Sequence, residues 1–462
     1  MSTPTTTTPG PLPDYINSAK PNPPTNRAPW FKNTAPTYAG IFLWFIFWDS
    51  IAGKALVAGG LGATLLGILL AGVICHFLFY LVPGILGRQT GLPLYIVGTS
   101  TFGAVGGLLM PGLLMGALQF GWLGVNTFGA ADYLANKGFH VPALFYPLCV
   151  LWAVGAAFVG LKGIQYVAKI ATYLPVIPLV VLLLGMALFG GSGFRYTPPA
   201  ETAQAGGSLT AILLMVGAIV GFFATAGAAG VDFGLNSRDD NDVQMGGYVG
   251  IIAAVLVTAG IAAVALAGAW AAGVMEPDFL GDTGVRMTDA LAQKLPGAYP
   301  LIMIGLTLAA FPGACFSSFI AANSFKTVLP KVNPFVSVGI GAIVSIVLAV
   351  TKIAGNLGGV FGIIGASFGP ICGAMAADFL LAGRRWSGPR AGFNPAGWIA
   401  WAVGFVVGIM PNLHAWQPSI PDVPAAPVAA FIVGFVLYFA CAKAGVITPV
   451  VPMENRADAV LE

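Results

Sequence analysis

Long runs of apolar residues, separated by short polar segments, make up almost the whole chain after its first 36 residues. A helix that crosses the hydrocarbon core of a bilayer needs about 20 mainly apolar residues, because each residue adds about 1.5 Å along the helix axis. Twelve runs approach or exceed this length, and each is predicted to be a membrane-spanning helix. The predicted spans are 37–60, 62–86, 103–130, 142–164, 167–190, 208–233, 246–274, 297–323, 334–353, 356–382, 395–412 and 424–445.

The composition agrees with this pattern. Hydrophobic residues account for 57% of the 462 residues and charged residues for 8%, whereas soluble domains have roughly 25% charged residues. The chain is therefore predicted to be a multi-pass membrane protein whose surroundings are the lipid bilayer. A formal net charge of +3 without a basic motif predicts no binding to nucleic acid.

Cysteine and histidine do not form metal or disulfide patterns. The five cysteines stand singly in apolar runs without CxxC spacing, and the three histidines are scattered without an HExxH motif. Isolated cysteines in apolar runs behave as small hydrophobic residues. Neither a disulfide framework nor a zinc site is expected.

Lysine and arginine set the predicted orientation. With the N-terminus in the cytoplasm, fourteen of them fall on the cytoplasmic side and five outside, and Lys54 lies within the first span. Cytoplasmic loops carry the excess of these residues, so both termini are predicted to be cytoplasmic, in a cell inner membrane. Residues 1–36 are rich in Thr and Pro and are expected to be a disordered tail rather than a signal peptide. Residues 446–462 are expected to be a second cytoplasmic tail.

The run from Leu306 to Pro330 carries the most conspicuous polar residues within a span. Ser317, Ser318 and Asn323 follow a Pro-Gly pair in an otherwise apolar stretch. Hydrocarbon offers such groups no partners, so they should face protein, water or a ligand. The alternative is that the hydroxyls bond to their own backbone or to a neighbouring helix. Ala314, Ser317 and Ser318 share one helix face and suit a small cation, while Asn323 lies about 180° round the helix.

Two further spans carry aromatic candidates for a binding site. Trp122 and Asn126 are one helical turn apart, and Gln119 lies three residues before Trp122. An aromatic plane beside an amide suits a flat polar ring, although a Trp in a span is more often a packing residue. In the sixth predicted span, Phe222 and Phe223 precede a run of small residues that suits a discontinuous helix and could stack on a ring.

The first span contains an acidic residue near its centre. Asp49 would be costly there unless it is paired, hydrated or bound to a cation. Lys54 follows five residues later, about 140° round a regular helix, so the two face each other only if the helix unwinds between them, which Gly53 would permit. A structural ion pair, a cation or proton site and a contact with substrate all remain open for Asp49.

Catalytic motifs are missing from the sequence. It contains no Ser/His/Asp set, no P-loop and no paired carboxylates near an interface. Polar residues at mid-depth in spanning helices are typical of secondary transporters. The chain is therefore expected to be a transporter and not an enzyme, and a channel is the less favoured alternative.

Four stretches resemble the nucleobase–cation symporter family one, which includes cytosine and hydantoin permeases. They are the aromatic-Gly-x-amide segment Gly121–Asn126, the hydroxyl-rich segment Phe316–Asn323, the loop Arg88–Gly106 and the helix end Ala377–Arg385. The resemblance implies an all-α, leucine-transporter-type fold of 12 transmembrane helices. Two inverted five-helix repeats, residues 37–190 and 208–382, would be followed by two peripheral helices within 395–445.

The resemblance also implies roles for individual residues. A planar ring would lie between Trp122 and Phe223 and be held by Asn126 and Asn323, with Gln119, Phe222 and Asp49 as additional candidates for substrate binding. Sodium would be bound by Ala314, Ser317 and Ser318 together with carbonyls of the first span, around Phe42 and Phe45. Three features depart from the family pattern, the first being that Asn126 stands where hydantoin permeases have a longer amide. Phe223 stands where hydantoin permeases have Trp, and the first span offers Asp49 but no amide near Ile46.

The expected function is the import of a nucleobase or a related planar N-heterocycle, coupled to Na⁺ or H⁺ by alternating access. The alternative is the same fold carrying another small solute, such as an amino acid or a vitamin precursor. No cofactor other than a bound Na⁺, and no obligate protein partner, is expected.

Overall fold

A computed structural model describes residues 12–162, 173–198, 207–275 and 286–453. Within these ranges, the regular elements are helices, and the only β-type contacts are two isolated bridges, Ala28 with Ser237 and Arg390 with Val450. The α-helices are α1 (Asp14–Asn17), α2 (Thr34–Phe42), α3 (Phe45–Ile74), α4 (Leu81–Thr90), α5 (Leu94–Val97), α6 (Thr99–Phe102), α7 (Leu114–Asp132), α8 (Phe145–Lys162), α10 (Val176–Gly193), α11 (Gly207–Ala228), α12 (Gly230–Gly234), α13 (Asp240–Gly247), α14 (Ala254–Ala271), α15 (Met287–Lys294), α16 (Tyr299–Val328), α17 (Pro334–Val350), α18 (Leu357–Leu381), α19 (Pro395–Trp416) and α20 (Ala426–Lys443).

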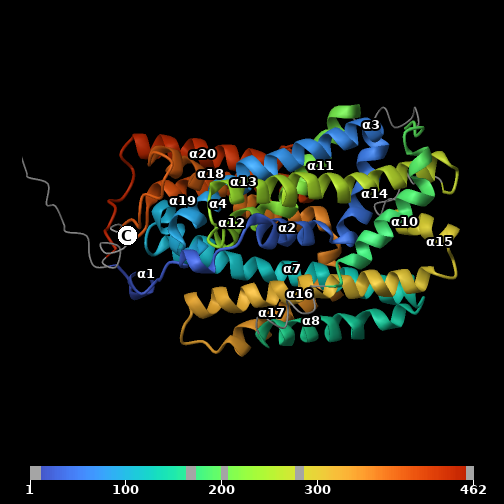
Figure 1. Cartoon of the computed structure of the whole chain (residues 1–462), viewed down its shortest axis with the longest axis horizontal. Coiled ribbons are helices and arrows are strands. Elements are labelled where there is room, and N and C mark those ends of the chain that lie inside the picture. The colour runs from blue at the N-terminus through green and yellow to red at the C-terminus, as the bar shows by residue number, and fades with distance from the viewer. Residues whose placement is uncertain (1–11, 163–172, 199–206, 276–285, 454–462) are drawn as a thin grey trace, which may run out of the picture.

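The long helices run side by side along the long axis of the molecule (Figure 1). Short helix α15 lies at one end of this bundle, and α1 lies at the other end together with the C-terminal segment. Several long helices continue through π-helical segments, at Cys75–Tyr80, Leu108–Leu113, Tyr133–Gly138 and Tyr248–Ala253. Short 3-10 turns occur at Pro24–Asn26, Trp30–Lys32, Pro142–Leu144 and Ile353–Gly355. The predicted all-helical fold class is confirmed.

Among the described residues, ten helical stretches are long and apolar enough to cross a membrane. One of them, Trp48–Thr90, is 43 residues long and covers parts of two predicted spans, and α17 is a shorter apolar helix of 17 residues. Outward-facing apolar side chains such as Leu151 (70% exposed) and Phe335 (64% exposed) suit contact with lipid. The multi-pass membrane character is confirmed, and the count of twelve crossings stays a prediction.

Two breaks interrupt the first part of the chain. Leu43 and Trp44 separate α2 from α3, with Trp44 in an extended conformation (φ −70°, ψ 93°). Gly60 has φ 76° and bends α3 at the predicted boundary between the first two spans. Gly53, which would permit unwinding between Asp49 and Lys54, lies within a helical part of α3. The break falls between Phe42 and Phe45, the two positions proposed to offer free carbonyls.

The N-terminal segment differs from the expected disordered tail over the part that the structure describes. Leu12 and Ile16 are buried, and the Tyr15 hydroxyl donates a hydrogen bond to the Ala104 carbonyl. Asn22 Nδ2 donates to the Leu235 carbonyl over 3.1 Å. These apolar and backbone contacts fasten residues 12–36 to the ends of the neighbouring helices. Residues 1–11 lie outside the described part.

Small residues allow the helices to approach closely. A Cβ atom added at Gly268 of α14 would lie 2.0 Å from the Phe189 carbonyl oxygen of α10. One added at Gly373 of α18 would lie 2.1 Å from the Phe431 carbonyl oxygen of α20. Backbones therefore meet without intervening side chains at these crossings, as is common in membrane bundles.

Candidate functional site

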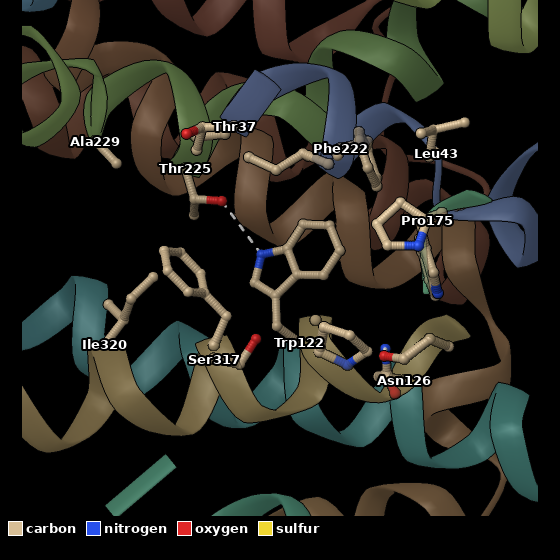
Figure 2. Close-up of a pocket in the computed structure, with 18 of the residues that line it drawn as sticks. Thr37, Leu43, Trp122, Asn126, Pro175, Phe222, Thr225, Ala229, Ser317 and Ile320 are labelled. Carbon is tan, nitrogen blue, oxygen red and sulfur yellow. Dashed lines mark hydrogen bonds between the residues drawn. The ribbon is translucent and has the colours of Figure 1, made fainter. Parts of the chain in front are cut away.

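A cavity of about 420 Å³ lies at the centre of the bundle. Residues of α2, α7, α11 and α16 line it, and Pro175 and Pro178 at the start of α10 complete one side. Figure 2 shows Trp122 between α2 and α11 above and α16 below. A volume of this size is within the range of small-molecule sites, about 300–1,000 Å³.

Aromatic rings form the wall of this cavity. Trp122 and Phe222 meet edge to face with ring centroids 5.2 Å apart, and Trp44 stacks on Phe222 at 6.0 Å and 10°. The indole N–H of Trp122 donates to Thr225 Oγ1 over 3.2 Å (Figure 2). Phe361 of α18 packs against Trp122 at 5.1 Å. The predicted pairing of the third and sixth spans at one cavity is therefore present in the geometry.

Phe223, the expected principal stacking residue, lies outside the lining of the cavity. Phe223 is 0% exposed and does not line the cavity, because it stacks on Phe42 at 5.6 Å and 6°. Phe222 lines the cavity in its place. Adjacent residues on a helix point about 100° apart, so a shift of one residue moves the ring out of the cavity. The sequence analysis does not include Trp44, Thr225 or Phe361 among the site residues. Trp44 does lie between Phe42 and Phe45, the two positions expected to offer carbonyls to sodium.

Two of the amides predicted at the site, Asn126 and Gln119, lie on α7 and differ in how many of their hydrogen-bonding groups are available to a ligand. Trp152 Nε1 donates to Asn126 Oδ1 over 2.9 Å, and Asn126 Nδ2 donates to the Ala310 carbonyl over 3.0 Å. Asn126 lines the cavity, but its amide is already held at both ends. Gln119 also lines the cavity, and its Nε2 has only the Met115 sulfur at 3.6 Å. Gln119 is therefore the better-placed amide for a ligand.

The predicted polar patch on α16 is divided between two environments. Ser317 lines the cavity and points toward Trp122 in Figure 2. Ser318 donates back to the Ala314 carbonyl over 3.1 Å, and its Cβ would be 2.7 Å from a Cβ added at Gly160 of α8. Ala314 packs in a buried cluster with Leu123, Ala156 and Cys315. The alternative of back-bonding thus describes Ser318, and only Ser317 faces the cavity.

The remaining predicted ligands lie away from the cavity lining. Asn323 is exposed on α16 and does not line it. The side chains of Phe42 and Phe45 are buried in the aromatic core, and the Phe42 carbonyl accepts a hydrogen bond from Trp48 Nε1. Figure 2 places the ribbons of α2 and α16 on opposite sides of the cavity. In this conformation the cavity therefore separates Ser317 from the break in the first span.

Asp49 does not line the cavity, contrary to its expected place among the substrate contacts. It is 3% exposed and accepts hydrogen bonds from the hydroxyls of Tyr133 and Thr288. For Asp49, an ion pair with Lys54 or with another helix was one expectation. The hydrogen bonds to Asp49 come from Thr288 of α15 and from Tyr133, in the π-helical segment after α7. A polar residue at mid-span is thus a poor guide to cavity position when loops fold back onto the bundle.

The described residues that line the cavity include no Asp, Glu, Lys, Arg or His. Polar groups come from side-chain amides and hydroxyls, namely those of Gln119, Asn126, Thr37, Thr225 and Ser317, and from the indoles of Trp44 and Trp122. Nor do the described residues contain a group of three or more His, Cys, Asp or Glu that could hold a metal ion. The arrangement can hold a neutral ring between aromatic walls and offer it a few hydrogen bonds.

No family model matches the chain. Curated relatives are the cytosine permeases of Escherichia coli strains K12 and O157:H7, each 25% identical over 370 residues, which are 79% of this chain and 80% of the relative. These relatives align with most of the chain, so the likeness is not confined to one motif.

Solved structures share the fold. Mhp1, a nucleobase-cation-symport-1 family transporter, matches in a closed conformation with bromovinylhydantoin bound, with a TM-score of 0.66, 16% identity and 96% and 99% of the two chains covered. Its inward-facing conformation matches with a TM-score of 0.67 and 17% identity, covering 96% and 97%. A Na⁺-coupled sialic acid symporter in an outward-open state matches with a TM-score of 0.58 and 14% identity, covering 95% and 93%. The predicted transporter fold is confirmed.

Proposed function

We propose that this chain, whose resemblance to the nucleobase–cation symporters is supported by its cytosine permease relatives and by the Mhp1 fold, is a secondary active symporter for a neutral planar N-heterocycle of the nucleobase class. One observation carries the choice of substrate: the central cavity has aromatic walls and no charged lining residue in the described part of the chain. The chain would act by alternating access and perform no catalysis.

The cavity walls supply two kinds of contact. The rings of Trp122, Phe222 and Trp44 offer apolar faces and edges to a flat ligand, and such ring pairs stabilise one another beyond the area that they bury. Gln119 offers both an acceptor and donors, and Ser317 offers a hydroxyl. A nucleobase presents a π face and alternating ring donors and acceptors, so it matches both kinds of contact.

The absence of charge from the described lining argues against the alternative of an amino acid or an acidic vitamin precursor. Moving a charged group from water to an apolar site costs several kcal/mol unless a partner compensates for it. The described side chains around this cavity offer no such ionic partner. A neutral heterocycle loses only hydrogen bonds to water, which amides and hydroxyls replace.

A thermal-stability screen of the purified protein tests this proposal. Cytosine, uracil and hypoxanthine are the probes, and orotate, which is uracil bearing a carboxylate, is the charged control. At about 100 times its Kd, a ligand stabilises the folded state by about 2.7 kcal/mol. We expect the melting temperature to rise with at least one neutral base and not with orotate or with an amino acid. An equal rise with orotate, or no rise with any base, would reject this substrate class.

The coupling cation is proposed to use Ser317 when the first span and α16 close around the cavity. Ser317→Ala should raise the Na⁺ or H⁺ concentration needed for half-maximal substrate binding about tenfold, because the cation loses one oxygen contact, a loss comparable to that of one hydrogen bond to a charged group. Ser318→Ala is the matched control, because its hydroxyl bonds to its own helix. Binding of the base would be titrated against Na⁺ at two pH values. A larger effect of Ser318→Ala, or an unchanged cation dependence in the double variant, would contradict the assignment.

The same proposal includes the location of the protein in the cell and its internal repeats. The protein would lie in a cell inner membrane with both termini in the cytoplasm and would need no protein partner. The two inverted repeats would be residues 37–190 and 208–382, with α19 and α20 as peripheral helices. Substrate and cation would each favour the closed state, so each would raise the affinity of the other.

A further inference from the structure

A buried cluster of three residues, Asp49, Tyr133 and Thr288, joins parts of the chain that are far apart in sequence. The Tyr133 hydroxyl donates to Asp49 Oδ2 over 2.5 Å, and the Thr288 hydroxyl donates to the same oxygen over 2.6 Å. The Thr288 backbone N–H donates to Asp49 Oδ1 over 3.0 Å. The three residues are at most 3% exposed. We call these residues the Asp49 cluster.

The Asp49 cluster fastens α15 to the bundle. Thr288 is the second residue of α15, Asp49 belongs to α3, and Tyr133 begins the π-helical segment that follows α7. A further contact comes from Lys137, whose Nζ lies 3.3 Å from Asp289 Oδ1. Charge around the cluster is complementary: burial lowers the pKa of Arg286, but the carboxylates of Asp49, Asp132 and Asp289 and the phenol of Tyr133 raise it by more.

The position of the cluster relates it to transport. In Figure 1, α15 lies at the opposite end of the bundle from α1 and the C-terminal segment. The central cavity extends in the other direction along α2, as far as Pro36 near the start of that helix. Trp48, which is 1% exposed, precedes Asp49 and packs against Phe42 and Phe222. An aromatic layer thus lies on the cavity side of the Asp49 cluster.

We propose that the Asp49 cluster holds the α15 end of the transport path shut, and that it must open each time the cavity faces that side. Asp49 is then a positioning residue for alternating access and does not contact the substrate. This inference rests on the proposed function in that the chain is a transporter. It is independent of which substrate the cavity binds.

The proposal predicts how the two access states shift. A hydrogen bond to a charged group favours the state that contains it about tenfold or more. Tyr133→Phe and Thr288→Val each remove one hydroxyl and keep the shape of the side chain. Each should therefore raise the fraction of molecules that are open at the α15 end by about tenfold. Asp49→Asn keeps the size but loses the charge, and should act in the same direction.

The experiment measures access to a cysteine placed in the cavity of the full-length protein. Ala309, which is half-buried and lines the cavity, is changed to Cys in a Cys441→Ser background, because the other four native cysteines are buried. A membrane-impermeant maleimide is applied to sealed vesicles of either orientation, identified by a C-terminal tag. Labelling rates are compared from the α15 face and from the α1 face, without substrate.

Tyr133→Phe and Thr288→Val should accelerate labelling from the α15 face about tenfold without accelerating it from the α1 face. The controls are Tyr80→Phe and Thr258→Val, whose buried hydroxyls bond to the carbonyls of Val243 and Ala254 outside the cluster. Unchanged rates from the α15 face in all three cluster variants, or equal acceleration from both faces, would overturn the proposal, since the cluster would then be structural only. Failure of the nucleobase screen would leave this result standing, because labelling needs no ligand.

Discussion

Trp122→Leu should lower the affinity for the transported base by about ten- to a hundredfold. Stacking of a base on an aromatic side chain contributes about 1–3 kcal/mol, and Trp122 is one of two tryptophans in the wall of the cavity. The substitution also leaves the Thr225 hydroxyl without the indole N–H that donates to it. The affinity would be measured by calorimetry or by equilibrium binding of the radiolabelled base. Trp122→Phe keeps an aromatic face and should lose less affinity.

Two controls separate loss of binding from loss of folding. Trp401 of α19 also donates its indole N–H, to the Ser367 carbonyl over 3.1 Å, but it does not line the cavity, so Trp401→Leu should leave the affinity unchanged. Phe223→Leu should reduce thermal stability more than affinity, because its ring is packed behind the cavity wall. If Trp401→Leu and Trp122→Leu lowered the affinity equally, a specific contact with Trp122 would be ruled out.

Gly268→Ala, at one of the two glycines of α14, should destabilise the protein strongly. The added Cβ would lie 2.0 Å from the Phe189 carbonyl oxygen and 3.1 Å from the backbone nitrogen of Gly193. Backbone atoms cannot swing aside as a flexible side chain can, so α10 and α14 would have to separate. Overpacking usually costs about 1–3 kcal/mol, and a clash between backbones should reach the upper end of that range. Melting of the purified protein in detergent measures the loss.

Gly260 provides the matched control on the same helix. The nearest atom to a Cβ added there is a terminal carbon of Leu65, 3.8 Å away. Gly260→Ala should be neutral or slightly stabilising, because Gly within a helix costs roughly 0.5–1 kcal/mol relative to Ala. Equal destabilisation by the two variants would show that the cause is the loss of glycine itself and not the contact between helices.

The predicted spans show how far hydrophobic pattern alone reaches. Residues of one span share one solvent, the lipid, so a run of apolar residues identifies a helix without knowledge of its neighbours. The expected boundary after residue 60 coincides with the turn at Gly60, and the break in the first span lies between the predicted carbonyl positions Phe42 and Phe45. Trp122 of the third span, Phe222 of the sixth and Ser317 of the eighth, all expected at one site, line the same cavity.

Hydrophobic pattern does not show which residues of a helix face the cavity, nor which connecting segments fold back onto the bundle. Phe222 and Phe223 are equally apolar and adjacent, and only the packing of Phe223 on Phe42 decides which ring reaches the cavity. Ser317 and Ser318 are likewise identical in sequence terms, and only the contact of α16 with α8 separates their roles. For Asp49, the deciding partner is Thr288, which is 239 residues later.

The sequence by itself therefore determined the solvent of each helix, the boundary at Gly60 and the kind of polar group available, because these depend on local composition. Only the tertiary structure decided which side of each helix faces the cavity and which buried polar group has a partner. A rotation of about 100°, the angle between neighbouring residues, changes neither the hydropathy nor the length of a span. The same rotation moves a side chain from the wall of the cavity into the packed core.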